Sequence, residues 1–226
     1  MTRSPPGRPK ANTPPWGGDA SGVSGAVKRI GLFGGSFDPV HNAHVALACV
    51  ALDTLALDEL RWVPAGEPWQ KARRLSSGVQ RVAMLELAIA GEPRFVIERC
   101  ELDRAGPSYT IDTVHTAQRR EPDAQWFLIV GQDQFANLHT WHGWQELLSL
   151  VTLAVAARPG AAQPADAQVQ GHAYQVLPLP SMDLAASAIR ERVARGEPIG
   201  HLVPPMVARY IDQHALYLSD GANSGS

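Results

Sequence analysis

Hydrophobic residues along this chain follow two alternating patterns. Short continuous apolar runs, such as WFLIV at residues 126–130, predict strands that are covered on both faces of a sheet. Longer runs with apolar residues at helical spacing predict helices between these strands. The predicted strands cover residues 28–33, 59–63, 95–97, 125–130, 151–156 and 174–177, and the predicted helices cover 42–57, 79–90, 109–119, 144–148, 187–195 and 205–214.

This alternation predicts an α/β fold with a doubly wound, mainly parallel sheet. Parallel strands joined through helices require right-handed crossovers, and ligands of such sheets bind outside the carboxyl ends of the strands. We expect one domain over residues 27–218 and a flexible tail over 219–226. Residues 1–26 are rich in Pro, Gly, Ser and Ala and have little to bury, which predicts a disordered leader.

Composition narrows the class of partner and the cellular setting. The formal net charge is -2 at pH 7, which gives no global electrostatic reason to expect nucleic acid or an anionic membrane as partner. No apolar segment reaches membrane-spanning length, and the N-terminus lacks the apolar core of a signal peptide. Cys49 and Cys100 are predicted to be buried free thiols, so we expect a reducing, cytoplasmic setting.

The segment GGSFDPVHNAH at residues 34–44 joins a predicted strand to a predicted helix. Free backbone N–H groups and the positive end of a helix dipole meet at such a junction, which suits phosphate binding. His41 and His44 stand three residues apart and share a helix face, so both imidazoles can donate to one anion. A glycine turn or a histidine pair alone is a weak signal; their coincidence favours a phosphate site.

This segment resembles the first signature of the nucleotidyltransferase superfamily with the H-x-G-H motif. The resemblance implies a Rossmann-like nucleotidyltransferase fold in which His41 and His44 bind the triphosphate of ATP and stabilise charge as the α-phosphorus is attacked. Ala43 stands where the family usually has glycine, which puts the approach of the nucleotide in question. The ATP contacts implied by the same segment are Gly34, Gly35, Ser36 and Phe37.

A second element, LAASAIR at residues 184–190, resembles the family pattern I-S-S-T-x-I-R. The resemblance implies that Ser187 and Arg190 hold the triphosphate, and that Arg190 acts with the two histidines in catalysis. Ala185 and Ala186 replace the serines of the pattern. Ser187 is also a candidate helix N-cap, which would give it a purely structural role.

Three further segments resemble nicotinate-nucleotide adenylyltransferases: VPAGEPWQK at 63–71, GPSYTIDT at 106–113, and GQD at 131–133 followed by LHTWHGW at 138–144. The resemblance implies that Gly131 and Asp133 contact ATP. It also implies contacts to the pyridine nucleotide from Lys71, Tyr109, Thr110 and Trp141, and we add Arg158 because it follows a predicted strand.

Each of these assignments has a structural alternative. Lys71 could be a loop lysine and Arg158 part of a surface turn. Ser108 could cap a helix while Tyr109 packs in the core, and a tryptophan pair at helical spacing such as Trp141 and Trp144 is usually core.

The resemblance implies adenylyl transfer from ATP to nicotinate mononucleotide, giving deamido-NAD and pyrophosphate. We expect Mg²⁺ to accompany ATP and expect no dedicated metal site in the protein. His139 and His142 have no cysteine or carboxylate at zinc-ligand spacing and are interpreted as bystanders. Two alternatives remain: an adenylyltransferase of the same fold acting on nicotinamide mononucleotide or phosphopantetheine, or a non-catalytic nucleotide-binding protein. Phosphopantetheine enzymes typically carry threonine where this chain has His41.

Overall fold

The computed structural model describes residues 27–66, 75–157, 167–178 and 184–218. The strands of this part of the chain are β1 (Arg29–Gly35), β2 (Glu59–Pro64), β3 (Phe95–Ile97), β4 (Gln125–Gly131), β5 (Thr152–Ala157) and β6 (Tyr174–Pro178). The longer helices are α1 (Asn42–Thr54), α2 (Gly78–Ile89), α3 (Thr110–Arg120), α5 (Trp144–Leu150), α7 (Ala186–Ala194) and α8 (Pro205–Gln213). Shorter helical segments are α4 (Gln132–Ala136), the 3₁₀ helix η1 (Leu138–Thr140) and α6 (Ala167–Gln170).

The strands form one parallel sheet in the order β3-β2-β1-β4-β5-β6. Strands β2 and β3 follow on one side of β1, and the chain then crosses to the other side of β1, where it forms β4, β5 and β6. This is the strand order of a doubly wound fold with its switch point between β1 and β4. The predicted fold class and all the predicted strands are therefore confirmed, with strand ends that differ by one or two residues.

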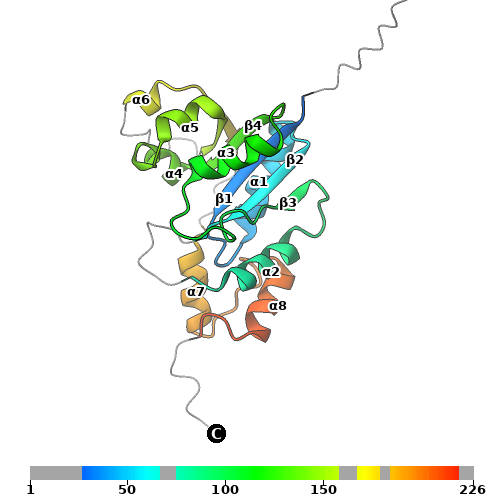
Figure 1. The fold of residues 1–226 in the computed structure, drawn as a ribbon. Coiled ribbons are helices and arrows are strands. Elements are labelled where there is room, and N and C mark those ends of the chain that lie inside the picture. The colour runs from blue at the N-terminus through cyan, green and yellow to red at the C-terminus, as the bar shows by residue number, and fades with distance from the viewer. Residues whose placement is uncertain (1–26, 67–74, 158–166, 179–183, 219–226) are drawn as a thin grey trace, which may run out of the picture.

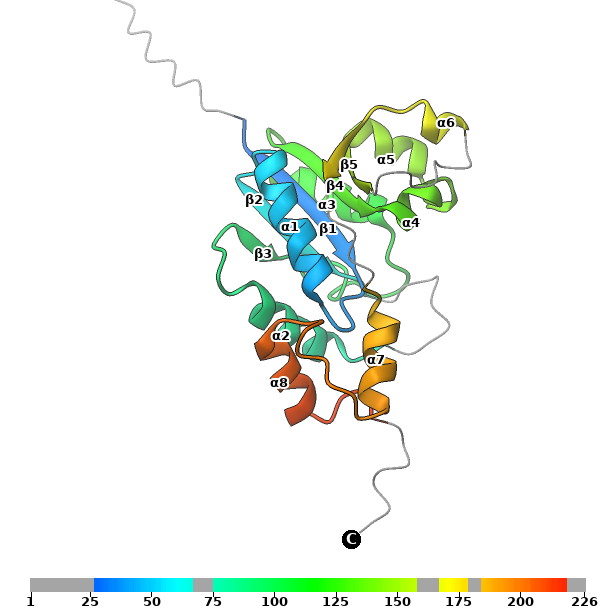
Figure 2. The same ribbon diagram turned by 180° about the vertical axis from the view of Figure 1, so that it is seen from behind.

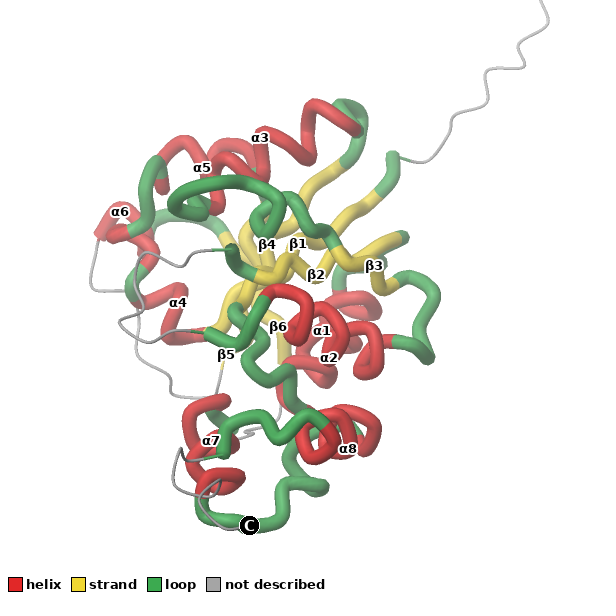
Figure 3. The backbone as a smooth tube through the Cα atoms, turned by 60° about the horizontal axis from the view of Figure 1, so that its bottom comes forward, coloured by secondary structure: helices red, strands yellow, loops and turns green. Residues whose placement is uncertain are grey.

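Helices cover both faces of the sheet, as the two opposite views show (Figures 1 and 2). Helix α1 lies on one face, and α3 and α5 lie on the other; Figure 3 shows the strands between these two layers. Strand β4 explains why the apolar runs are continuous, because Phe127 and Ile129 join the core on the α1 side while Trp126, Leu128 and Val130 join the core on the α3 side.

Two expectations about the cysteines need correction. Cys49 is exposed on α1, because the buried face of that helix is formed by Leu47, Ala48, Ala51 and Leu52. Cys100 is half-buried in a turn beyond β3. Both thiols are free, as predicted.

The predicted leader, 1–26, and tail, 219–226, lie outside the described residues. Among the helices that are described, none is long and apolar enough to cross a membrane.

Candidate active site

A cavity of about 390 Å³ opens at the carboxyl ends of β1, β2 and β4. These ends flank the switch point of the sheet, where the connections leave in opposite directions and leave a crevice. The cavity has the size of a small-molecule site. Its wall includes two sets of the predicted residues: Gly34, Gly35, Ser36, His44 and Gly131 on one side, and Tyr109, Thr110 and Trp141 on the other.

Two glycines of the cavity wall leave space rather than fill it. A Cβ atom added to Gly34 or Gly131 would meet nothing within 4 Å, so neither glycine is required by close packing inside the protein. Both line the cavity at the end of a central strand. The missing side chains therefore let a ligand approach the backbone of β1 and β4 closely.

Arginine side chains hold the turn that follows β1. Arg81 of α2 donates from Nη1 to the carbonyl of Ser36 (3.0 Å), and Arg190 of α7 donates from Nη1 to the carbonyl of Asp38 (2.7 Å). The Asp38 carboxylate is fully buried and accepts a hydrogen bond from the Tyr217 hydroxyl (2.6 Å). Elements far apart in the sequence thus fix the backbone that leads into the histidine pair.

His41 and His44 stack face to face at the start of α1. Their ring centroids lie 3.6 Å apart with an interplanar angle of 23°. The backbone N–H of His41 donates to Nδ1 of His44 (3.2 Å). Because Nδ1 of His44 accepts, its neutral ring carries the proton on Nε2. His44 lines the cavity, so a ring whose tautomer is fixed by this bond stands at the wall.

His41 lies behind His44 and is 5% exposed. Burial lowers the pKa of His41 to about 4, so its imidazole is neutral at pH 7. A neutral His41 ring keeps a positive charge out of the core.

The helix N-terminus itself offers fewer free donors than expected. The backbone N–H of Asn42 donates to the carbonyl of Leu202 (2.9 Å), and that of His41 donates to His44. The α1 end is therefore partly capped by the protein itself.

The opposite wall of the cavity is aromatic. Tyr109 is the N-cap residue of α3, and Trp141 ends η1; both line the cavity and also pack against the core on the α3 side. Trp144 packs against the same core without lining the cavity, as expected. His142 lies in the cavity wall with its ring 4.6 Å from that of Tyr109, although the sequence suggested a bystander.

Several predicted site residues lie outside the cavity wall. Phe37 and His41 are buried next to it, Arg190 is bonded to the Asp38 carbonyl, and Asp133 and Ser187 are exposed on the first turns of α4 and α7. Lys71 and Arg158 fall outside the described residues.

The capping roles considered for two serines are wrong. Ala185, not Ser187, is the N-cap residue of α7, and Tyr109, not Ser108, is the N-cap residue of α3. Ser187 lies inside the first turn of α7, Ser108 lies two residues before the start of α3, and neither helix has a side-chain hydrogen bond from its N-cap residue.

One residue in the cavity wall escaped the sequence analysis. Glu101 is 8% exposed and accepts a hydrogen bond from the Thr113 hydroxyl (2.8 Å). An acidic side chain in a turn is ordinarily solvated, and this one is covered by α3 and by the segment that follows β2. The available signal was its place a few residues before the SYT segment.

The chain is similar in sequence to known proteins over most of its length. Residues 32–192 match the model of the cytidylyltransferase-like family. A curated relative from Methylibium petroleiphilum is 50% identical over 84% of this chain and 92% of its own length, and one from Bordetella petrii is 48% identical over 84% of this chain and 100% of its own; both carry the name "Probable nicotinate-nucleotide adenylyltransferase".

The fold also matches a solved structure. The nicotinic acid mononucleotide adenylyltransferase of Plasmodium falciparum, complexed with NaAD, superposes with a TM-score of 0.68 at 20% identity, over 84% of this chain and 97% of the other. At that identity the match supports the fold alone, whereas the curated relatives are similar enough to show the family. The chain belongs to the cytidylyltransferase-like family and, within it, to the nicotinate-nucleotide adenylyltransferases.

Proposed function

We propose that this protein transfers the adenylyl group of ATP to nicotinate mononucleotide and releases pyrophosphate, giving deamido-NAD. The observation that carries the proposal is one continuous cavity that joins the glycine turn and His44 to the aromatic wall of Tyr109 and Trp141. The first part offers open backbone and an imidazole donor for phosphate groups. The second offers ring surface for a planar heterocycle.

The chemistry needs no nucleophilic side chain. A phosphate oxygen of the mononucleotide forms a bond to the α-phosphorus of ATP, and the bond from that phosphorus to the bridging oxygen of pyrophosphate breaks. Catalysis then consists of aligning two anions and stabilising the charge that grows on the α-phosphate and the leaving group. His44 serves this second task through its Nε2–H, whose direction is fixed by the bond at Nδ1.

Ser187 and Arg190 complete the triphosphate site in this proposal, with Asp133 at the ribose of ATP. Lys71 is assigned to the mononucleotide side on the resemblance alone, and Arg158 only because it follows a predicted strand. Arg190 is held next to the glycine turn by its bond to the Asp38 carbonyl, which supports a place near the triphosphate.

Mg²⁺ is proposed to enter with ATP rather than as a resident ion. Among the described residues, no group of three or more His, Cys, Asp or Glu side chains could hold a metal ion. Mg²⁺ that accompanies nucleotides is usually held mainly by phosphate oxygens and water. Bound there, the ion would neutralise phosphate charge.

The decisive test is acceptor choice. The purified full chain is given ATP and Mg²⁺ with nicotinate mononucleotide, nicotinamide mononucleotide or phosphopantetheine, and pyrophosphate release is measured for each. We expect the highest kcat/KM with nicotinate mononucleotide and deamido-NAD as the product. A preference for another acceptor would change the substrate, and no release with any of the three would favour a non-catalytic nucleotide-binding protein.

A further inference from the structure

Glu101 is out of place in a cavity that binds anions. Among the described residues that line the cavity, it is the one acidic side chain, and it is 8% exposed. Both proposed substrates carry phosphate groups, which a carboxylate repels. A buried carboxylate is also costly to keep unless something in its surroundings favours its charge.

The neighbours of Glu101 leave that charge incompletely compensated. Burial raises the pKa of Glu101, and the Thr113 hydroxyl, the Arg104 guanidinium, the Gly66 backbone and the Ser108 hydroxyl only partly oppose this effect. Arg104 forms an ion pair with Asp112 of α3 (3.7 Å), so its charge is shared. Arg81 of α2 acts on Glu101 from a distance, and the Cys100 thiol stays neutral because burial raises its pKa to about 11.

The substrate itself can supply the missing charge. The pyridine ring of nicotinate mononucleotide is bonded to ribose through its nitrogen and therefore carries a formal positive charge. Aromatic faces favour a cationic ring, and Glu101 shares the cavity wall with the rings of Tyr109, Trp141 and His142. A carboxylate and an aromatic wall together suit the positively charged ring nitrogen, which is separate from the carboxylate that nicotinate carries at another position of the ring.

We infer that Glu101 is a specificity-determining residue whose carboxylate pairs electrostatically with the pyridinium ring of the acceptor nucleotide. This inference rests on the proposed function and deepens it. It explains why an acid is buried in the cavity: it selects a positively charged ring over a neutral ring of the same shape.

The test separates charge from shape on both partners. Glu101→Gln keeps an oxygen that accepts from the Thr113 hydroxyl but removes the charge. The ligands are nicotinate mononucleotide and a matched analogue in which a benzene ring bonded through carbon replaces the pyridinium, so that the ring is neutral. Dissociation constants for both are measured with the wild-type protein and the variant.

We expect Glu101→Gln to weaken binding of nicotinate mononucleotide by about tenfold or more, because an attraction between opposite charges in a desolvated site is lost. Binding of the neutral analogue should be unchanged, as should the KM for ATP. Thr113→Val is the matched control, since it removes the hydrogen bond to Glu101 but keeps the charge. Thr113→Val should retain the wild-type preference for the charged ring.

Equal losses for both ligands in Glu101→Gln would show that Glu101 only supports the cavity wall, and unchanged affinity for both would deny it any role. Either result overturns the inference. If Glu101→Gln fails to fold, Glu101→Asp is the second variant. Glu101→Asp keeps the carboxylate, so loss of the preference for the charged ring in this variant would also overturn the inference. Failure of the wild-type protein to make deamido-NAD is a separate outcome that rejects the proposed function.

Discussion

The two histidines at the start of α1 differ in their burial and in their contacts. His41 is buried and neutral, stacks on His44 and provides the backbone N–H that fixes the tautomer of His44. His44 lines the cavity, where we propose that its Nε2–H donates to a phosphate oxygen. The H-x-x-H spacing predicts a shared face, but only the structure shows that one ring orients the other.

His44→Ala should lower kcat by about 10²- to 10³-fold, the usual cost of losing one preorganised donor in a transition state. Its effect on the KM for nicotinate mononucleotide should be small, because that substrate's ring lies at the other wall in our proposal. Steady-state kinetics with both substrates measure this. His115→Ala is the control, because His115 is hydrogen-bonded to Glu146 (3.0 Å) at the surface; unchanged turnover in His44→Ala would remove His44 from the mechanism.

Trp141 both lines the cavity and packs against the core, so its two roles predict different outcomes. If it stacks on the acceptor ring, Trp141→Ala raises the KM for nicotinate mononucleotide by about tenfold, as expected for the loss of an aromatic stacking partner worth roughly 1–1.5 kcal/mol. Trp144→Ala, which removes a tryptophan that packs only against the core, should lower stability with little change in KM. A Trp141→Ala protein that loses stability but keeps its KM would assign this side chain to the core.

At the scale of elements, β1, β4 and β5 were predictable because each is an apolar run that is covered on both faces. The short segments α4, η1 and α6 were not, because three to five residues are too few to display helical periodicity. Glu101 and His142 joined the cavity unpredicted for another reason. Their positions depend on how α3 and the segment after η1 meet in space, which local sequence does not encode.

The C-terminal segment supports the turn after β1, a role that the sequence did not suggest. Tyr217 reaches back to the turn after β1, where its hydroxyl donates to the buried Asp38 carboxylate. Burial foremost, and then the bond to Asp38, raises the pKa of the Tyr217 hydroxyl, so it remains a donor over the working pH range. The backbone N–H of Ser76 contributes a second, longer bond to the same carboxylate (3.3 Å).

Tyr217→Phe should lower the free energy of unfolding by about 1–3 kcal/mol, since it removes a donor from a buried carboxylate. It should also lower kcat/KM for ATP, because the turn that it supports leads into the histidine pair. Urea denaturation and kinetics measure the two effects. Tyr210→Phe is the control, because the described residues make no hydrogen bond to its hydroxyl and its loss should leave both quantities within error.

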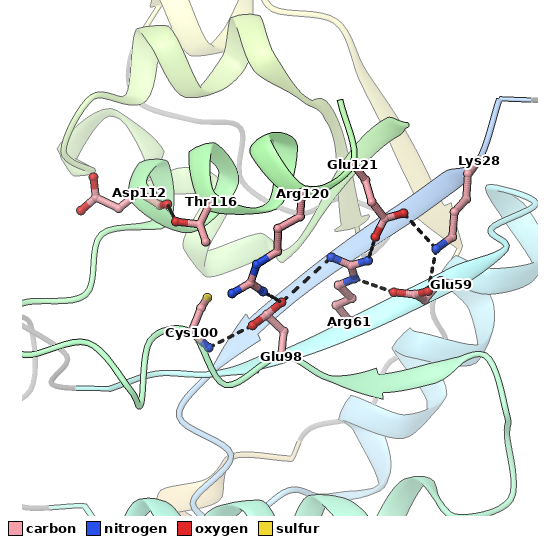
Figure 4. A network of polar contacts seen from close by, with 9 residues as sticks. All are labelled: Lys28, Glu59, Arg61, Glu98, Cys100, Asp112, Thr116, Arg120 and Glu121. Atoms are coloured by element: carbon pink, nitrogen blue, oxygen red, sulfur yellow. Dashed lines mark hydrogen bonds and ion pairs between the residues drawn. The ribbon is translucent and has the colours of Figure 1, made fainter. Parts of the chain in front are cut away.

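At the scale of the whole molecule, a stabilising ion-pair network and the candidate active-site cavity lie at opposite ends of the sheet. Figure 4 shows an ion-pair network around Arg61 of β2, which contacts Glu59, Glu121 and, at 4.0 Å, Glu98. Lys28 bridges Glu59 (2.9 Å) and Glu121 (3.0 Å). The network ties the amino ends of the central strands to the end of α3, whereas the cavity opens at the carboxyl ends.

This separation predicts that the network can be weakened without changing the chemistry. The Arg61 side chain is 9% exposed and lies over the Trp126 ring (5.3 Å), so Arg61→Met leaves several carboxylates without their central cation. We expect a loss of about 2–4 kcal/mol in the free energy of unfolding, as for breaking a mostly buried ion pair. Kinetic constants of the folded variant should match those of the wild type.

Acid dependence distinguishes this electrostatic effect from a simple packing defect. Burial alone would raise the pKa of Glu59 and Glu121, but hydrogen bonds from Arg61 and Lys28 outweigh it and hold both below the ordinary value of 4.5. The folded protein therefore binds these protons less readily than the unfolded chain, so the network stabilises fully above pH 4.5 and loses its contribution as the pH falls below it. Urea midpoints measured from pH 7 to pH 3 should show the gap between wild type and Arg61→Met shrinking in acid. Arg94→Met is the control, because it breaks only an exposed ion pair with Glu92 (2.7 Å), and its urea midpoint at neutral pH should match that of the wild type. If the difference in urea midpoint between the wild type and Arg61→Met does not change with pH, Arg61 contributes packing against Trp126 rather than charge.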